Sequence, residues 1–287
     1  IKKTKPSVVL TYTIKPNIYG GLACTLTNTP YISNITGLGS SIENGGFLQK
    51  LTLFLYKTAM KKAHCVFFQN KENQSFFTGK KIVKVKNILI PGSGVNTNYY
   101  DLMDYPPDGT INFLFVSRIM KEKGIDQYLE AAKYIKNKYP NTVFHIVGFC
   151  EEEYEDILKE LHDQQIVQFH GLQKDVKQFY RIAHCTVHPS YYPEGMSNVL
   201  LESSSCGRPV ITTNRSGCRE IVEDGVTGYI VEQKNSDDLI EKLERFLNLP
   251  YNNKAAMGKA ARVKVLQEFD RDIVKTLYIE EIRRITE

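Results

Sequence analysis

The chain has 287 residues, of which 42% are hydrophobic, and a formal net charge of +5 at neutral pH. This length can bury one large hydrophobic core or two ordinary ones. No run approaches the roughly 18 apolar residues of a membrane-spanning helix, and no secretory signal pattern is present, so a transmembrane or exported protein is not expected. The first residue is Ile1 rather than methionine, which suggests that an N-terminal piece is absent.

The positive charge is concentrated in the first part of the chain. Residues 1–110 contain 13 lysines, no arginine and 5 acids, whereas residues 111–287 contain 24 basic and 27 acidic side chains. The change falls at DYPPDGT (104–110), whose prolines and glycine are typical of a linker. We therefore predict a partial first domain over 1–106, a second domain over 107–269, and a C-terminal helix, 270–287, that returns to the first domain.

In chain order, the first half shows a weak alternation of strands and helices. Strands are predicted near 7–12, 31–35, 65–69 and 85–90, and helices near 17–27 and 47–62. Four strands are few for a doubly wound domain.

The predicted helix over 47–62 carries two stripes. The apolar stripe recurs at helical spacing and consists of Leu48, Leu51, Leu55, Ala59 and Ala63. The separate lysine stripe consists of Lys50, Lys57 and Lys61. One interpretation of the lysines is an ordinary solvated face. The other, which the charge of this half favours, is a basic amphipathic face that rests on an anionic membrane surface.

The second half alternates strands and helices more clearly. Strands are predicted at 111–116, 142–147, 166–170, 184–188, 209–213 and 228–231, and helices at 124–139, 151–162 and 175–183. This alternation favours an α/β fold with a parallel sheet covered on both faces. Such sheets bind ligands beyond the carboxyl ends of their strands.

Two cations follow the first strand of this half. Arg118 and Lys123 lie in SRIMKEKG, between a predicted strand and a predicted helix. At that position two cations suit a diphosphate. A solvated basic loop is the alternative.

The stretch EGMSNVLLE (194–202) adds a second signal. Gly195 permits close backbone approach, and Ser197 and Asn198 are good N-cap residues for a helix whose free amides form a phosphate site. Glu194 and Glu202 lie eight positions apart, up to roughly 12 Å along a helix, which is about the reach from a sugar past a diphosphate to a ribose. The alternative is two surface acids on an ordinary helix.

Cysteines and histidines do not indicate a metal site. The six cysteines form no C-x-x-C pair and are interpreted as buried thiols. The six histidines fall on separate predicted elements without metal-ligand spacing.

Several motifs together resemble the retaining glycosyltransferases of family GT4. The residues that carry the resemblance are SR-x4-KG (117–124), VGF (147–149), VQFHG (167–171), HPSYYPEGMSNVLLE (188–202), GRPVITT (207–213) and DGVTGYIV (224–231). KPSVVLTYTIKPNIYG (5–20) and ISNITGLGS (32–40) resemble the branch that extends lipid-linked oligosaccharides for bacterial capsule, O-antigen or glycoprotein glycans. The resemblance implies the GT-B fold of two facing Rossmann-like domains, the first of them incomplete here.

The resemblance also implies roles. Arg118 and Lys123 would neutralise the diphosphate of a nucleotide-sugar, expected to be a UDP-sugar, and stabilise the leaving nucleotide. Glu194 would hold the donor sugar. The backbone amides of Gly195, Met196, Ser197 and Asn198 would bind the phosphates of the nucleotide-sugar. Glu202 would bind the ribose hydroxyls, and the turn at Gly171 and Leu172 would lie near the base. No metal and no cofactor are implied, and the departing phosphate would take the acceptor's proton.

Two departures from the family pattern stand out. Many relatives place a histidine in the loop where this chain has Thr36 and Gly37. Relatives also begin with a strand, a glycine-rich loop and two more βα units ahead of KPSVVL, so the chain resembles an N-terminally truncated enzyme.

These features predict a hexosyl- or N-acetylhexosaminyltransferase that acts on a lipid-linked or polysaccharide acceptor. It would be cytoplasmic and peripheral on the inner face of the plasma membrane, held there through 47–62, and no nucleic-acid partner is expected. A non-catalytic nucleotide-sugar-binding subunit or an inactive fragment is the alternative. A Rossmann-type NAD(P) enzyme is disfavoured because no G-x-G-x-x-G follows a strand.

Overall fold

The structure is a computed structural model that describes residues 1–39, 42 and 45–287. Ser40, the last residue of the ISNITGLGS motif, lies outside the described residues. Contacts divide the chain into two compact units: residues 1–94, 193–197 and 269–287 form the first, and residues 95–192 and 198–268 form the second. This division falls earlier in the chain than the boundary at 106 predicted from composition, and it assigns a short internal segment to the first unit.

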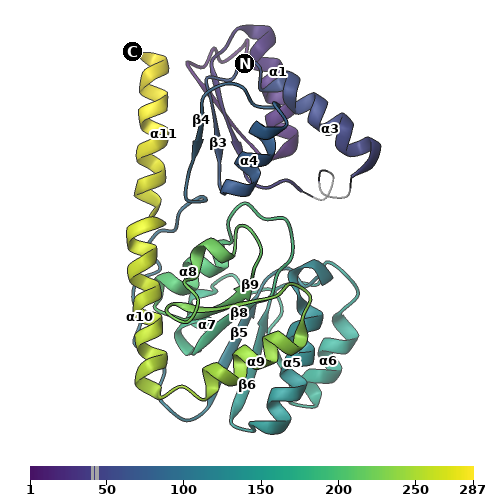
Figure 1. The fold of residues 1–287 in the computed structure, drawn as a ribbon, viewed down its shortest axis with the longest axis vertical. Coiled ribbons are helices and arrows are strands. Elements are labelled where there is room, and N and C mark those ends of the chain that lie inside the picture. Colours follow the sequence, from purple (N-terminus) through teal and green to yellow (C-terminus); the bar gives the residue numbers. More distant parts are fainter. Residues whose placement is uncertain (40–41, 43–44) are drawn as a thin grey trace. The chain divides into compact units, whose positions relative to one another are not determined.

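The first unit is built on a parallel sheet of four strands in the order β1-β2-β3-β4. The strands are β1 (Val9–Tyr12), β2 (Tyr31–Ile35), β3 (Cys65–Phe68) and β4 (Asn87–Leu89). Each lies within a stretch that the sequence predicts as a strand. Their carboxyl ends therefore meet at one edge of the sheet, where the following loops begin (Figure 1).

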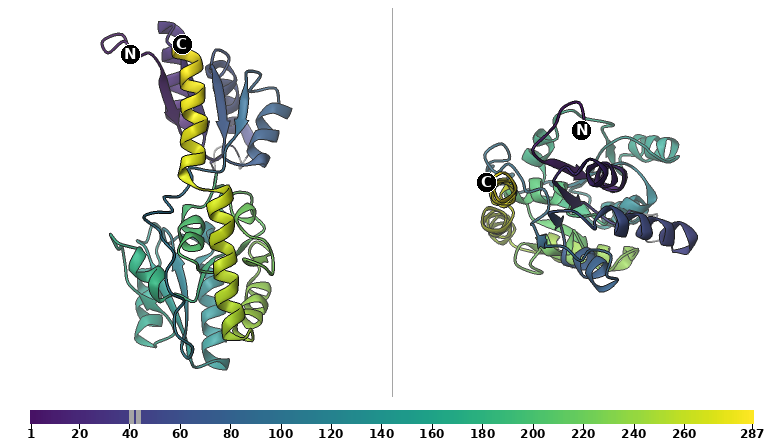
Figure 2. Two further views of the ribbon diagram at one scale, coloured as in Figure 1. Left: turned by 90° about the vertical axis from the view of Figure 1, so that its left-hand side faces the viewer. Right: turned by 90° about the horizontal axis from the view of Figure 1, so that it is seen from above.

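Helices cover both faces of this sheet. The π-helical turn η1 (Pro16–Gly20) and helices α1 (Gly21–Thr27), α3 (Gly46–Ala59) and α4 (Lys71–Gly79) pack on one face, where Tyr56 and Phe77 meet Val66 and Phe68. Helix α11 (Arg271–Thr286) packs on the other face through Val274 and Tyr278 (Figure 2). The predicted C-terminal helix over 270–287 thus exists and belongs to the first unit.

A buried carboxylate fastens α11 to the first unit. Glu281 accepts a hydrogen bond from Lys86 Nζ at 2.7 Å, lies 3.3 Å from His64 Nε2 and pairs with Arg284. Burial opposes its ionisation, but the hydrogen bond and charge of Lys86, with the charge of Arg284, outweigh burial and lower the pKa of Glu281. A buried charge in a helix is tolerated only with such partners.

The apolar repeat of α3 does not form one buried stripe. Ala59 and Ala63 are buried as part of the core, whereas Leu48 and Leu51 are exposed. The apolar repeat predicted from the sequence thus contributes its later residues to the core and leaves Leu48 and Leu51 at the surface.

The second unit contains a parallel sheet of six strands in the order β10-β9-β8-β5-β6-β7. The strands are β5 (Ile111–Val116), β6 (Thr142–Val147), β7 (Gln168–Phe169), β8 (Cys185–His188), β9 (Val210–Thr213) and β10 (Gly228–Val231). All six were predicted from the sequence, with β7 shorter than expected. The order reverses beside β5, which is where open parallel sheets bind their ligands.

Both faces of this sheet are also covered, as the alternation of buried residues along β5 requires. Phe113 and Phe115 face the larger core, and Leu114 and Val116 face the smaller one. The helices are α5 (Ile125–Lys138), α6 (Glu155–Asp163), α7 (Lys177–Ile182), α8 (Asn198–Ser205), α9 (Ser236–Leu247) and α10 (Tyr251–Glu268), with 3-10 turns η2 (Lys121–Lys123) and η3 (Arg219–Ile221).

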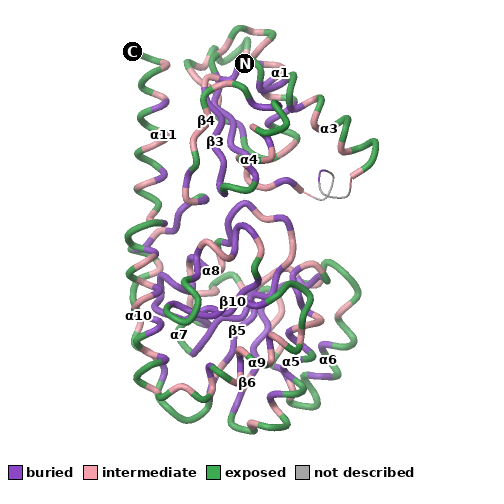
Figure 3. The backbone as a smooth tube through the Cα atoms, viewed as in Figure 1, coloured by how far each residue is buried: buried purple, intermediate pink, exposed green. Residues whose placement is uncertain are grey.

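The inner strands of both sheets and β10 are largely buried, whereas the edge strands β1, β4 and β7 are partly exposed (Figure 3). All six cysteines are free thiols, and five of them are buried, in agreement with the sequence prediction. Within the part of the chain that the structure describes, we find no helix long and apolar enough to span a bilayer.

Candidate functional site

The loop after β5 holds the two predicted cations. Arg118 follows the strand by two residues, and Lys123 ends η2, just ahead of α5. Gly124 has a positive φ of 79°, and a Cβ there would lie 2.2 Å from the carbonyl oxygen of Pro189. Only glycine allows the β5–α5 loop to approach the chain that leaves β8 so closely. The fold therefore fixes the cations beside the residues that follow β8.

An aromatic ring lies against both cations. The Tyr192 ring centroid is 5.3 Å from Arg118 Cζ and 4.5 Å from Lys123 Nζ. The Lys123 residue is only 7% exposed, whereas the Arg118 side chain is 37% exposed. A ring face attracts a cation and fixes its position. The two charges are thus held together at the carboxyl end of β5.

Arg118 also has a carboxylate partner. Its Nη1 donates to Glu151 Oε2 at 2.5 Å, and both side chains are partly exposed. Burial alone would lower the pKa of Arg118, but its hydrogen bond with Tyr192 and the charge of Glu151 raise it. Exposed ion pairs of this kind are weak, about 0–1 kcal/mol, so an incoming phosphate can replace the carboxylate. Two cations placed in this way can bind an anion.

Helix α8 carries the second predicted carboxylate. Asn198 begins the helix, and Glu202 lies more than one turn inside it. Tyr180 Oη donates to Glu202 Oε2 at 3.0 Å. Tyr180 is buried, and burial raises its pKa well above the ordinary value, so it stays a neutral donor. The Glu202 carboxylate is thereby oriented, and a carboxylate has about four acceptor positions, enough to receive ligand hydroxyls as well.

The predicted base-side turn also lies at the carboxyl edge of the second sheet. The Gly171 carbonyl oxygen accepts a hydrogen bond from Gly148 N at 2.9 Å, which joins the loops after β7 and β6. Leu172 is exposed. An exposed apolar side chain beside a backbone turn can cover the flat face of a base.

The segment 193–197 belongs to the first unit, with four predicted site residues: Glu194, Gly195, Met196 and Ser197. Asn70 Nδ2 donates to the carbonyl oxygens of Glu194 at 3.2 Å and Gly195 at 2.8 Å. A Cβ on Gly195 would lie 2.2 Å from the Thr36 carbonyl oxygen and 2.4 Å from Gln69 Oε1. The loops after β2 and β3 therefore leave no room for a side chain at position 195. The sequence instead predicts that this glycine lets the backbone approach a phosphate closely.

The other six predicted residues lie in the second unit: Arg118, Lys123, Gly171, Leu172, Asn198 and Glu202. The structure brings Arg118 and Lys123 together around one ring and places Gly171 and Glu202 on loops and helices of the same sheet edge. Sequence reasoning missed Tyr192, Glu151 and Asn70. Tyr192 lies within the motif HPSYYPEGMSNVLLE, two residues ahead of Glu194. This position was the only sequence feature that could have indicated a role for Tyr192 in the site.

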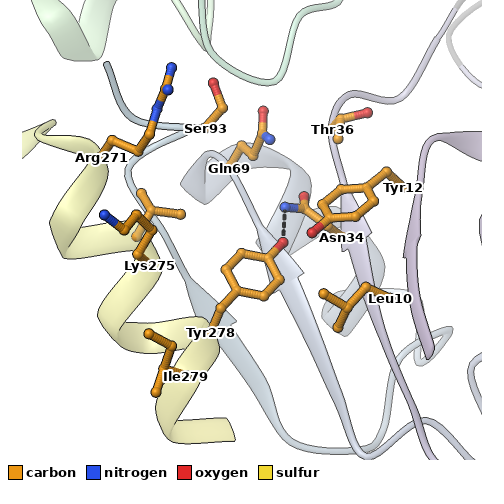
Figure 4. A pocket seen from close by; sticks show the side chains of 11 residues that line it. Leu10, Tyr12, Asn34, Thr36, Gln69, Ser93, Arg271, Lys275, Tyr278 and Ile279 are labelled. Atoms are coloured by element: carbon orange, nitrogen blue, oxygen red, sulfur yellow. Dashed lines mark hydrogen bonds between the residues drawn. The ribbon is translucent and has the colours of Figure 1, made fainter. Parts of the chain in front are cut away.

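The first unit also contains an open pocket of about 490 Å³ between β1 and α11 (Figure 4). Leu10, Tyr12, Tyr278 and Ile279 form its apolar walls, and Asn34 Nδ2 contacts Tyr278 Oη at 2.5 Å across its floor. The remaining lining side chains include polar and cationic ones at the end nearer the strand termini: Thr36, Gln69, Ser93, Arg271 and Lys275. Aromatic walls with hydrogen-bonding groups suit a sugar, and the cations suit an anionic substituent.

A metal centre does not emerge from the described residues. Across residues 1–39, 42 and 45–287, no three His, Cys, Asp or Glu side chains are grouped so that they could hold a metal ion.

Solved structures of glycosyltransferases share this fold. The chain superposes on Anabaena Alr3699/HepE in complex with UDP with a TM-score of 0.82 and 21% identity, covering 96% of this chain and 78% of that one. It superposes on a glycosyltransferase from Rickettsia africae with a TM-score of 0.80 and 23% identity, covering 100% and 79%. The fold is GT-B, as the motifs predicted, and the class of protein is a glycosyltransferase.

The family follows from the sequence match. Residues 106–264 match the model of glycosyl transferases group 1, and residues 1–70 match that of glycosyl transferase 4-like proteins. The chain belongs to glycosyl transferases group 1.

Curated relatives include two enzymes with named acceptors. One is the N,N'-diacetylbacillosaminyl-diphospho-undecaprenol alpha-1,3-N-acetylgalactosaminyltransferase of Campylobacter jejuni, 26% identical over 94% of this chain and 75% of the relative. Another is the UDP-Gal:alpha-D-GlcNAc-diphosphoundecaprenol alpha-1,3-galactosyltransferase of Escherichia coli, 26% identical over 98% and 77%. The capsular polysaccharide biosynthesis glycosyltransferase CapM of Staphylococcus aureus is 26% identical over 95% and 75%.

Proposed function

We propose that this glycosyltransferase moves a hexosyl or N-acetylhexosaminyl group from a UDP-sugar to a lipid-linked glycan, with retention of anomeric configuration. The observation that carries the proposal is the pair of cations, Arg118 and Lys123, fixed against Tyr192 at the carboxyl end of β5. The names of the Campylobacter and Escherichia relatives, which specify diphosphoundecaprenol-linked acceptors, support the acceptor class.

Each predicted residue has a role in this proposal. Arg118 and Lys123 neutralise the donor diphosphate and then stabilise the charge that develops on the leaving nucleotide. Glu202, oriented by Tyr180, accepts hydrogen bonds from the ribose, and Glu194 accepts them from the donor sugar. The backbone amides of residues 195–198 bind phosphate oxygens.

The remaining steps need no further protein base. The turn at Gly171 and Leu172 contacts the base of the nucleotide. The acceptor hydroxyl attacks the anomeric carbon from the face that the nucleotide leaves, and its proton passes to the departing phosphate. No metal or other cofactor enters the proposal. The enzyme works at the inner face of the plasma membrane, where a lipid-linked acceptor is anchored.

The test is UDP binding by calorimetry on the full chain. Arg118→Ala removes a charge-assisted hydrogen bond worth roughly 1.5–3 kcal/mol, so UDP affinity should fall by about 10- to 150-fold. Lys123→Ala should have a similar effect. Arg181→Ala, which removes an exposed arginine of α7 in the same unit, is the matched control and should bind UDP like the parent.

Two outcomes contradict the proposal. One is that the parent binds UDP and both cation variants bind it with the same affinity, which would show that the diphosphate does not bind at this loop. The other is a correctly folded parent that binds no uridine nucleotide at all. Glu151→Gln provides an internal check: it frees Arg118 from its carboxylate, so UDP affinity should stay level or rise slightly.

A further inference from the structure

The first half of α3 exposes four large apolar side chains. Phe47, Leu48, Leu51 and Phe54 are 81%, 57%, 42% and 65% exposed. Phe47, Leu51 and Phe54 lie on one side of the helix, opposite the buried Thr52 and Tyr56. Leu48 lies at the edge of this side, in line with Leu55 and Ala59. Figure 3 shows this part of α3 with exposed positions recurring along it. A contiguous exposed apolar stripe on a folded unit marks an interaction site.

A lysine-rich groove begins where this stripe ends. It has a volume of about 450 Å³ and is lined by Phe54 and Ile82 and by four lysines: Lys57, Lys61, Lys81 and Lys84. Lys57 lies in the last turn of α3 and Lys61 just after the helix, whereas Lys81 and Lys84 come from the connection between α4 and β4. Two segments that are separate in sequence thus place four exposed ammonium groups around one hollow.

The surrounding charge reinforces this groove. Residues 1–94 contain 13 lysines and two acids, Glu43 and Glu72. This excess of positive charge attracts anions over about a Debye length, roughly 8 Å at physiological salt.

We propose that these residues form a docking surface for an anionic lipid bilayer, here called the α3 surface: Phe47, Leu48, Leu51, Phe54, Lys57, Lys61, Lys81 and Lys84. The apolar stripe enters the interface between headgroups and acyl chains, and the lysine groove binds lipid phosphates beside it. This inference rests on the proposed function, because a lipid-linked acceptor requires the enzyme to work at a membrane.

A second copy of the chain fits the α3 surface less well. A two-fold contact would oppose each groove to itself or to its own lysine-rich surroundings, and like charges brought together across an interface are repulsive. A bilayer surface supplies both complements at once, apolar chains for the stripe and phosphates for the groove.

The first experiment measures partitioning of the full chain onto vesicles. Vesicles of phosphatidylcholine with phosphatidylglycerol should bind the parent, and vesicles of phosphatidylcholine alone should bind it far less. The variant Lys57→Gln, Lys61→Gln, Lys81→Gln, Lys84→Gln should lose at least about tenfold in binding to the anionic vesicles. The matched control carries the same loss of charge at exposed lysines elsewhere, Lys2→Gln, Lys3→Gln, Lys5→Gln, Lys15→Gln, and should retain most of the binding.

The second experiment uses the absence of tryptophan from the chain. Phe54→Trp introduces a single reporter in the α3 surface, and Tyr134→Trp introduces one at an exposed position of α5 in the other unit. Anionic vesicles should shift the emission of the Phe54→Trp variant to shorter wavelength and leave that of the Tyr134→Trp variant unchanged. A stripe that enters the interface also predicts that brominated lipids quench the emission of the Phe54→Trp variant.

Three results would overturn the inference. Equal loss of vesicle binding in the groove variant and its control would show that binding depends on the net charge of the protein and not on the lysine groove. An emission wavelength of the Phe54→Trp variant that does not change when the protein binds vesicles would show that the apolar stripe does not enter the lipid. Self-association of the parent that Phe47→Ser, Leu51→Ser and Phe54→Ser abolish, with vesicle binding intact, would assign the surface to a second copy.

These results are separable from failure of the proposed function. UDP affinity is measured on the same variants by calorimetry and should not change in any of them. Vesicle binding without UDP binding would sink the donor proposal and leave the α3 surface standing. UDP binding without vesicle binding would refute the α3 surface and leave the donor proposal standing.

Discussion

At the scale of single residues, the two carboxylates of EGMSNVLLE differ in their surroundings. Glu202 is oriented by a buried tyrosine in the second unit, and Glu194 lies in the segment that Asn70 holds in the first. This difference supports the different roles that the proposed function gives them, one at the nucleotide and one at the sugar.

Glu202→Ala should therefore weaken UDP binding by about 10- to 150-fold, because it removes a charged acceptor for ribose hydroxyls. Glu194→Ala should leave UDP affinity nearly unchanged and instead lower the rate of sugar transfer. Calorimetry with UDP and a transfer assay with a lipid-linked acceptor measure the two effects. Glu130→Ala, at an exposed position of α5, is the control. Equal loss of UDP affinity in the Glu202 and Glu194 variants would show that the roles are wrongly assigned.

At the scale of elements, α11 is fastened to the first sheet by the buried charge of Glu281. Its folded-state pKa is lowered, so its contribution to stability is present above the ordinary pKa of 4.5 and is lost as pH falls through the lower folded value. Glu281→Gln should reduce the free energy of unfolding by about 1–3 kcal/mol near neutral pH. The difference from the parent should shrink as pH falls below about 4.5.

Chemical denaturation at several pH values, followed by circular dichroism, measures this difference. Glu280→Gln changes the adjacent, exposed glutamate of the same helix and should have little effect at any pH. A Glu281→Gln variant as stable as the parent at neutral pH would mean that Lys86 and Arg284 gain as much from water as from the carboxylate.

At the scale of the whole molecule, the donor binding and the membrane docking that we propose would engage different parts of the chain. Hydrogen exchange on the full chain should show protection by UDP at residues 118–124, 171–172 and 195–202, with no change over 47–61. Anionic vesicles should reverse the pattern, protecting α3 while leaving the donor residues as they were. UDP-dependent protection confined to the pocket beside α11 would contradict the donor site proposed here.

The sequence alone determined the secondary structure of both sheets. Strands such as Ile111–Val116 and Thr142–Val147 are short apolar runs between helical repeats, a pattern that strands of a parallel sheet buried on both faces must show. It also determined that Arg118 and Lys123 follow a strand, because the end of an apolar run is a local feature. The motifs around them were enough to predict the family.

Only the tertiary structure decided which face of α3 is exposed and what surrounds the cations. A helical repeat gives the angle between side chains, but the side that is buried depends on neighbours distant in sequence, and here they cover Ala59 and leave Leu51 in water. Tyr192 reaches Arg118 from another strand's end, and Asn70 holds Glu194 in the first unit. Contacts between segments so far apart leave no periodic signal in the chain, since each is set by packing rather than by local propensity.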